Sequence, residues 1–366
     1  MDNNKNETLS ILQLSILIYV FLTGSAVVVG IGGEAKQDAW IAIGISTIIG
    51  MLLFRFYLWL LESSNQKSFF SLLEASFGKW LGKSVIFLYI LYFFYIASRV
   101  LRDFGELLVT TIYRSTPIEI VIILLILTVA YILIKGIEVL GRTAEIFIPY
   151  TMFFIAFTGL GVLISGEFHL MNLEPVLGDG MKPIINTIFP NLIGFPFGEL
   201  IVVLLLLSKL TFKKKLNKTS LWVVVIGGLT LVYVSIIQIG VLGVSIRDRA
   251  SFPLLTAARE ISLLNFIERV DLIIVFTVMF GIIVKVSLFF YGGLIGMEHI
   301  FNIPYRKLVF PFSMQIAFYS ILISPNMAEH IDEGLVVVPY YLHMPLQIGI
   351  PCLLGIVLIT KKRLQK

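Results

Sequence analysis

Cysteine is nearly absent from this sequence of 366 residues, and histidine is scarce. The single cysteine, Cys352, lies in the last apolar run, which excludes a disulfide framework or a thiolate metal site within one chain. The histidines are scattered without the spacing of metal ligands: His169, His299, His330 and His343. We therefore expect neither a metal site nor a cofactor.

Catalytic motifs are missing as well. The sequence contains no nucleotide-binding loop, no nucleophile elbow and no histidine-acid arrangement. An enzyme is therefore disfavoured.

Charge is sparse, at 14% of residues, whereas 58% are hydrophobic and the mean hydropathy is +0.95. These values are typical of a polytopic membrane protein. The apolar runs number about ten, each near the roughly 20 residues that cross a membrane as a helix, and they lack the alternation of a β-barrel. We predict an all-α membrane domain over 1–366, with spans near 9–33, 39–61, 84–110, 117–135, 143–166, 184–207, 219–246, 267–295, 306–324 and 340–360.

The basic residues set the expected orientation. With the N-terminus inside, most Lys and Arg of the connecting segments fall on the cytoplasmic side, which is the preferred arrangement. We therefore expect both termini in the cytoplasm. The lysines at 213–215 are interpreted as a solvated loop, and nucleic-acid binding is not predicted.

The first span is interrupted. Residues 21–33, FLTGSAVVVGIGG, place Thr23, Gly24 and Ser25 in the middle of an apolar run. Either the helix unwinds here, or these small residues let two helices pack closely.

A second interruption, FPNLIGFPFGEL at 189–200, has Pro190 and Pro196 with glycines between them, which breaks a helix. The breaks fall in the first and sixth spans, so the ten spans divide into two sets of five, about 9–166 and 184–360, with opposite orientations. Paired broken spans indicate a binding site at mid-membrane in transporters. The half-helix N-termini at Ser25 and Phe197 would face it, and an amino-acid carboxylate is the expected ligand group.

Several charges lie within the spans, where they need protein or water partners. Arg99 can pair with Asp103, and Arg102 with Glu106, at a spacing of four residues. Glu199 follows the second break, where it either caps the half-helix or binds a ligand amine or a proton.

Lys285 lies in the eighth span, where it either snorkels to the cytoplasmic face or needs an acidic or carbonyl partner. We expect that partner to be the backbone carbonyls freed by the break at 23–26. Before this lysine, FIERVDLI at 266–273 suggests an interfacial ion cluster, and 251–264 suggests an amphipathic helix that could cover the bundle.

Together with the ten-span layout, four stretches resemble the spore germination permease family: QDAWI at 37–41, SFGKWLGKS at 76–84, LEPVLGDGMKPI at 173–184 and FIERVDLI. That family comprises the B subunits of nutrient germinant receptors, within the amino acid-polyamine-organocation superfamily. The resemblance implies a leucine-transporter-like fold of ten helices in two inverted five-helix repeats. It also implies a receptor subunit in the inner membrane of bacterial spores that works with an A subunit and a C-subunit lipoprotein. The implied ligand is a nutrient, either an amino acid or, in some members, a sugar, a nucleoside or an ion.

Carried onto this chain, the resemblance places the ligand near the two breaks and the middle of the third span, at Thr23, Gly24, Ser25, Ala26, Ala97, Arg99, Phe195, Gly198, Glu199 and Leu200. Lys285 falls where sodium-coupled relatives bind an ion, so its ammonium could replace that cation. The alternative is that this lysine acts as a proton-linked switch. A secondary transporter, such as a proton-linked permease, remains the alternative to a sensor, and an ion conduit or scaffold is a third possibility.

Overall fold

The computed structural model describes residues 7–64, 68–210, 216–260 and 270–364. Its helices run, in chain order, as α1 (Ile11–Thr23), α2 (Ala26–Val29), η1 (Gly33–Asp38), α3 (Ala39–Glu62), α4 (Phe69–Phe77), α5 (Lys79–Thr111), α6 (Ile118–Lys135), α7 (Ile137–Ser165), η2 (Leu170–Leu173), α8 (Met181–Asn186), η3 (Thr187–Phe197), η4 (Gly198–Lys209), α9 (Leu216–Arg249), α10 (Pro253–Arg259), α11 (Val270–Phe301), α12 (Tyr305–Leu322), α13 (Met327–Asp332), η5 (Glu333–Val337), η6 (Pro339–Gly349) and α14 (Ile350–Leu364).

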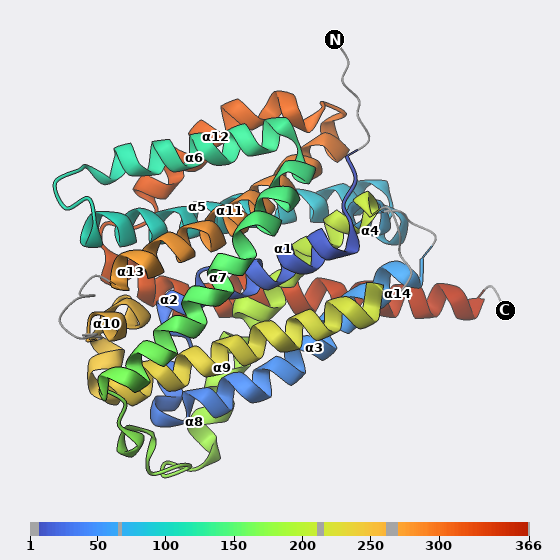
Figure 1. The fold of residues 1–366 in the computed structure, drawn as a ribbon. Coiled ribbons are helices and arrows are strands. Elements are labelled where there is room, and N and C mark those ends of the chain that lie inside the picture. Colours follow the sequence, from blue (N-terminus) through green and yellow to red (C-terminus); the bar gives the residue numbers. More distant parts are fainter. Residues whose placement is uncertain (1–6, 65–67, 211–215, 261–269, 365–366) are drawn as a thin grey trace.

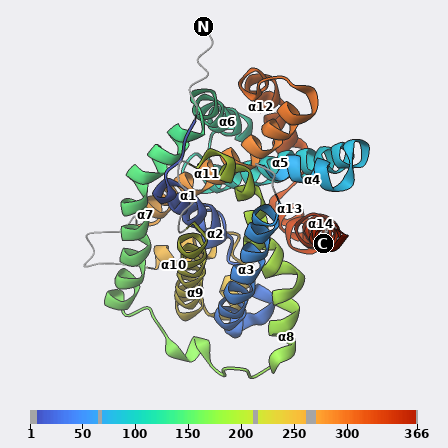
Figure 2. The ribbon, with the colours of Figure 1, turned by 90° about the vertical axis from the view of Figure 1, so that its right-hand side faces the viewer.

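The described part of the chain holds nine helices long and apolar enough to span a membrane. A tenth span results if α12 is joined to 327–337 across a bend of 110°. The helices form one bundle, and the chain enters and leaves it at the same end (Figure 1). Viewed along the bundle, α1 and α11 lie inside a ring that includes α3, α6, α7 and α9 (Figure 2).

The first span breaks where the sequence predicts. Helix α1 ends at Thr23, whose hydroxyl donates to the carbonyl of Tyr19 at 2.9 Å, and α2 begins at Ala26. Gly24 also packs against Gly281 of α11, because a Cβ on Gly24 would lie 2.8 Å from the Gly281 carbonyl oxygen. The two interpretations of this segment therefore hold together: the helix unwinds, and its glycine allows a close helix contact.

The second break is equally clear. The backbone of η3 is non-helical at Phe189 and at Phe195, each directly before a proline. Gly198 then packs against η6, because a Cβ there would lie 2.0 Å from Oε1 of Gln347. The Tyr57 hydroxyl of α3 lies 2.7 Å from the Gln347 carbonyl oxygen and 3.2 Å from that of Gly198. Protein groups thus satisfy irregular backbone at membrane depth.

Two of the stretches that carry the family resemblance contact each other at the end of the bundle opposite the termini. The Asp38 carboxylate accepts from the backbone nitrogen of Leu177 at 3.0 Å, and Gln37 donates to the Pro175 carbonyl at 3.1 Å. Lys36 pairs with Asp179 at 2.8 Å. The loop 173–180 is therefore fixed onto η1 and α3.

Some expectations concern residues outside those described. The lysines at 213–215 and most of the ion cluster at 266–273 belong to this group, as does 261–264 of the expected covering helix. Of that helix the structure describes α10, which buries Leu254, Leu255 and Ala258 against the bundle.

The contact of Gly24 with Gly281 predicts that even one methyl group there is destabilising. A Cβ on Gly281 would lie 2.5 Å from the Gly24 Cα, so Gly281→Ala should lower the free energy of unfolding by about 1–3 kcal/mol. Thermal unfolding in detergent measures this. Gly44→Ala is the matched control, because the nearest atom to its Cβ is 3.9 Å away. Equal stability of the two variants would contradict the contact.

Candidate functional site

A small cavity of about 70 Å³, here called the central cavity, lies where both breaks meet the middle of α5 and the segment α13–η5. Its wall contains apolar, acidic and basic side chains: Ser25, Val29, Ile96, Arg99, Val100, Asp103, Phe195, Glu199, Met327, His330, Ile331, Gly334, Leu335, Val338 and His343. The cavity is the point at which the two interrupted spans come together, as the sequence predicts.

Beside this cavity, Lys285 of α11 forms a buried ion pair with Glu199. Its Nζ lies 2.6 Å from Glu199 Oε2, and the two side chains are 0% and 3% exposed. The contact is an ion pair by distance, although its angle is not that of a hydrogen bond. Nζ also donates to the Ser25 hydroxyl at 3.1 Å and lies 4.2 Å from the centre of the Phe195 ring. Lys285 therefore links both breaks and does not snorkel.

These contacts correct two expectations in detail. The ammonium reaches the hydroxyl of Ser25 and a carboxylate, where we expected the freed carbonyls of 23–26. Glu199, for which capping was one of two alternatives, directs its carboxylate at the Lys285 ammonium. The physical reason is the same for both: an isolated charge at this depth is far more costly than a backbone carbonyl or amide, so the two charges pair with each other.

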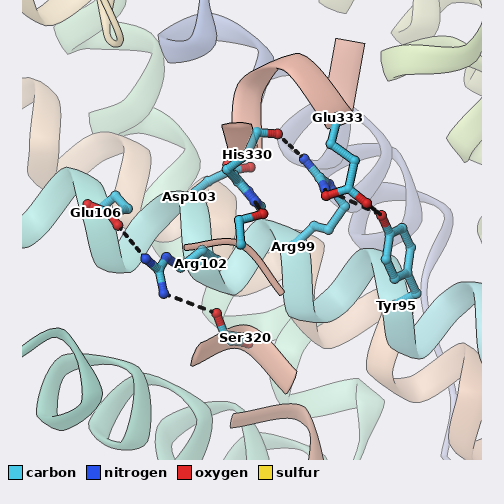
Figure 3. Close-up of polar contacts among 9 residues, drawn as sticks. Tyr95, Arg99, Arg102, Asp103, Glu106, Ser320, His330 and Glu333 are labelled. Atoms are coloured by element: carbon cyan, nitrogen blue, oxygen red, sulfur yellow. Dashed lines mark hydrogen bonds and ion pairs between the residues drawn. The ribbon is translucent and has the colours of Figure 1, made fainter. Parts of the chain in front are cut away.

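Arg99 joins α5 to the segment after the 110° bend (Figure 3). Its guanidinium lies 3.0 Å from Glu333 Oε2 and also donates to the His330 carbonyl. The Tyr95 hydroxyl donates to the same carboxylate at 3.0 Å. The predicted pair of Arg99 with Asp103 is thus wrong, because α13 and η5 supply acceptors that the helix spacing did not reveal.

Asp103 pairs instead with His330, whose Nε2 lies 2.8 Å from Oδ1 (Figure 3). The other ring nitrogen of His330 lies 3.1 Å from the Ser324 hydroxyl. The predicted pair of Arg102 with Glu106 is confirmed at 2.8 Å. The pair of Asp103 with His330 and the bond from Arg99 to the His330 carbonyl therefore hold α13 against α5.

A third polar group lies on η6. The Nδ1 of His343 is 2.9 Å from the Tyr92 hydroxyl and 3.0 Å from Nε2 of Gln347, and Gln347 Nε2 also donates to Tyr92 at 2.7 Å. All three side chains are buried. They fix the imidazole ring of His343 in the cavity wall.

The predicted site residues divide into two groups. Four of them line the cavity: Ser25, Arg99, Phe195 and Glu199. The others are buried in the packing around it, outside its wall: Thr23, Gly24, Ala26, Ala97, Gly198 and Leu200. Sequence reasoning named Asp103 only as a pairing partner and missed Glu333, His330 and His343. A buried histidine gives no spacing signal when its partners lie on other helices.

A larger cavity of about 550 Å³ lies next to the first one, at the end opposite the termini. The two share Val29, Phe195, Ile331, Gly334 and Leu335. Its wall also carries charges of both signs, namely Glu34, Lys36, Arg247, Asp248, Arg249 and Asp332. We call it the vestibule, and Phe195 lines both it and the central cavity.

The end of the bundle that carries the termini is tied together by charges. Glu7 accepts from the Tyr305 hydroxyl at 2.5 Å and from Arg306 at 2.6 Å, and it lies 3.4 Å from Lys209. The backbone nitrogen of Leu9 also donates to the Lys209 carbonyl at 2.9 Å. The N-terminal segment is thus joined to η4 and α12 at that end.

Across the described ranges, no group of three or more His, Cys, Asp or Glu side chains could hold a metal ion. The charged groups at the cavity form pairs with one another, which suits reversible binding of a small polar ligand.

Comparison with known proteins agrees with this architecture. The family model described as "Spore germination protein" matches residues 8–329. Spore germination protein KB of Bacillus subtilis (strain 168) is 37% identical over 357 residues, which cover 97% of this chain and 95% of that protein. Spore germination protein YndE of the same organism is 23% identical over 73% of each chain.

The solved structures give the fold. A crystal structure of MhsT in complex with L-phenylalanine superposes with a TM-score of 0.66 at 10% identity, covering 97% of this chain and 89% of that one. The predicted leucine-transporter-like fold with broken first and sixth spans is thereby confirmed.

The ion pair of Lys285 with Glu199 predicts that removing one charge destabilises the protein strongly and that removing both restores stability. Lys285→Met leaves the Glu199 carboxylate buried without its cation, which should cost about 3–5 kcal/mol of stability. Adding Glu199→Gln removes the orphaned charge, so the double variant should recover membrane abundance and thermal stability.

Lys36→Met is the matched control, because its pair with Asp179 is about half exposed, at 54% and 49%, and such a pair is worth about 0–1 kcal/mol. A double variant no more stable than Lys285→Met, or a single variant as stable as the control, would contradict the ion pair.

Proposed function

The chain belongs to the spore germination protein family, and from that premise we propose that it is the membrane-embedded B subunit of a germinant receptor, which senses a small nutrient, an amino acid, in the central cavity. The family is not an enzyme family, in agreement with the sequence. The observation that carries the proposal is the position of the cavity, between the two broken spans, with both charge signs in its wall.

The arrangement around the cavity supports a ligand that enters from the vestibule. Phe195, Ile331 and Leu335 belong to both cavities, so movement of a few side chains would connect them. A zwitterion suits a wall in which Arg99, Asp103 and Glu199 supply opposite charges. Its binding energy would reach α13 through the contacts that join this segment to α5.

The same proposal includes location and partners. The vestibule would open to the outside of the spore inner membrane, and both termini would be cytoplasmic, as the positive-inside pattern predicts. An A subunit and a C-subunit lipoprotein would complete the receptor and carry the signal onward.

A secondary transporter is the second candidate, because the fold is shared with transporters. Uptake of labelled amino acid into vesicles that contain this chain alone separates the two. Accumulation of the labelled amino acid inside the vesicles would favour the permease, and ligand binding without accumulation would favour the sensor. Ion flux that needs no nutrient would instead indicate a conduit within the receptor.

Filling the cavity tests the sensing proposal. Val100 lines it and is 4% exposed, so Val100→Phe should occupy the ligand volume and abolish germination in response to nutrient, at normal membrane abundance. Val336→Phe makes the same change on a side chain that is 59% exposed and outside the cavity wall, and should respond normally. A normal response of Val100→Phe would place the site elsewhere.

Lys285 supports a second prediction. Its ammonium lies between Ser25 of the first break and Glu199, where a cation is already supplied by the protein. The nutrient response should therefore be unchanged when choline replaces sodium in the germination buffer. A strict sodium requirement in the unaltered chain would show that Lys285 does not substitute for the ion.

A further inference from the structure

The ring of His343 has one nitrogen in use and one unused. The structure directs the Gln347 amide nitrogen at the ring and leaves Gln347 Oε1 buried without a partner. In this orientation Gln347 donates, so Nδ1 of His343 accepts. The proton of a neutral imidazole then lies on Nε2. This Nε2–H has no hydrogen-bond partner among the described residues, although the side chain is only 3% exposed and lines the cavity.

The Glu199 carboxylate shows the complementary feature. Oε2 faces the Lys285 ammonium, whereas Oε1 has no hydrogen-bond partner in the described part of the chain. The other charged groups of the wall are engaged: Arg99 with Glu333, and Asp103 with His330. His343 on η6 therefore offers a donor to a ligand, and Glu199 on η4 offers an acceptor.

The volume limits what can lie between them. A buried water needs about 10–15 Å³ of cavity volume, counted as the space that the centre of a water-sized sphere can occupy. By the same measure the cavity has about 70 Å³, which is room for about five waters. That is roughly the number of non-hydrogen atoms in glycine or alanine. Larger side chains would have to displace the apolar wall formed by Ile96, Val100 and Leu335.

We propose that His343 is a ligand-binding residue: its Nε2–H donates to the carboxylate of a glycine- or alanine-sized amino acid whose ammonium group binds Oε1 of Glu199. The inference rests on the proposed function, which it makes more specific by naming the two contacts and the size class. Tyr92 and Gln347 act as positioning residues, because they hold the imidazole in the tautomer that donates.

The test uses spores in which this chain, with its receptor partners, is the only nutrient receptor, and measures the half-maximal concentration of L-alanine and of glycine. His343→Asn keeps an acceptor toward Tyr92 and Gln347 but removes the Nε2 donor, so this concentration should rise at least about tenfold. His343→Gln offers an amide N–H near the place of Nε2 and should respond better than His343→Asn. Membrane abundance of each variant is the control.

Ligand analogues test the two contacts separately. Propionate lacks the ammonium group and ethylamine lacks the carboxylate, so neither should trigger germination, and L-leucine should be weaker than L-alanine. A response to L-leucine above that to L-alanine would overturn the size class.

A normal L-alanine response in His343→Asn, or a weaker one in His343→Gln than in His343→Asn, would overturn the role of His343. If Val100→Phe abolishes the response in the same spores, the proposed function stands and only this inference fails. A normal response of Val100→Phe, or a response to a neutral sugar but to no amino acid, would overturn both.

Discussion

The cost of burying charge governs the centre of this protein. Lys285 and Glu199 lie on different helices, almost inaccessible to solvent, and each is tolerable only while the other is present. The pair also fixes geometry, since Lys285 reaches Ser25 at the first break while Glu199 follows the second. Three elements that are distant in the sequence must therefore keep one arrangement, and the cavity forms beside it.

The broken spans impose a second cost, which is unpaired backbone. Buried side chains on neighbouring helices donate hydrogen bonds to these backbone carbonyls. Arg247 donates to the Ile31 carbonyl at 2.7 Å, Gln238 donates to that of Val27 at 3.0 Å, and Tyr57 donates to that of Gly198 at 3.2 Å. Because these donors are rigidly packed, the interruptions are defined structures and not loosely folded stretches.

Sequence reasoning found the features that depend on local composition. The spans follow from apolar length, and the breaks follow from Gly24 and from Pro190 and Pro196. It missed the segment 327–337, which is too short to be recognised as a span and begins at a cap formed by Asn326. It therefore also missed the partners of Arg99 and Asp103, because a spacing of four residues predicts contacts only within one helix.

The unused polar groups were beyond sequence reasoning for a related reason. Whether His343 donates or accepts depends on Tyr92 and Gln347, and Tyr92 is 251 residues away in the chain. Gly24 shows the opposite case, in which a residue had two plausible roles and the structure supports both. Local patterns locate such residues, but only the packed helices decide what they contact.

Sensing and transport would make different demands on the end of the bundle that carries the termini. Glu7 there holds Tyr305 and Arg306, and Leu9 is hydrogen-bonded to Lys209. A transporter must break these contacts in every cycle to release its ligand on that side. A sensor can keep them closed and move only the segment that covers the cavity, α13–η5, whose ties to α5 are the pairs of Arg99 with Glu333 and of His330 with Asp103. Under the proposed sensing role, the smaller rearrangement would involve only the residues around the cavity, and the ligand would not need to pass through the protein.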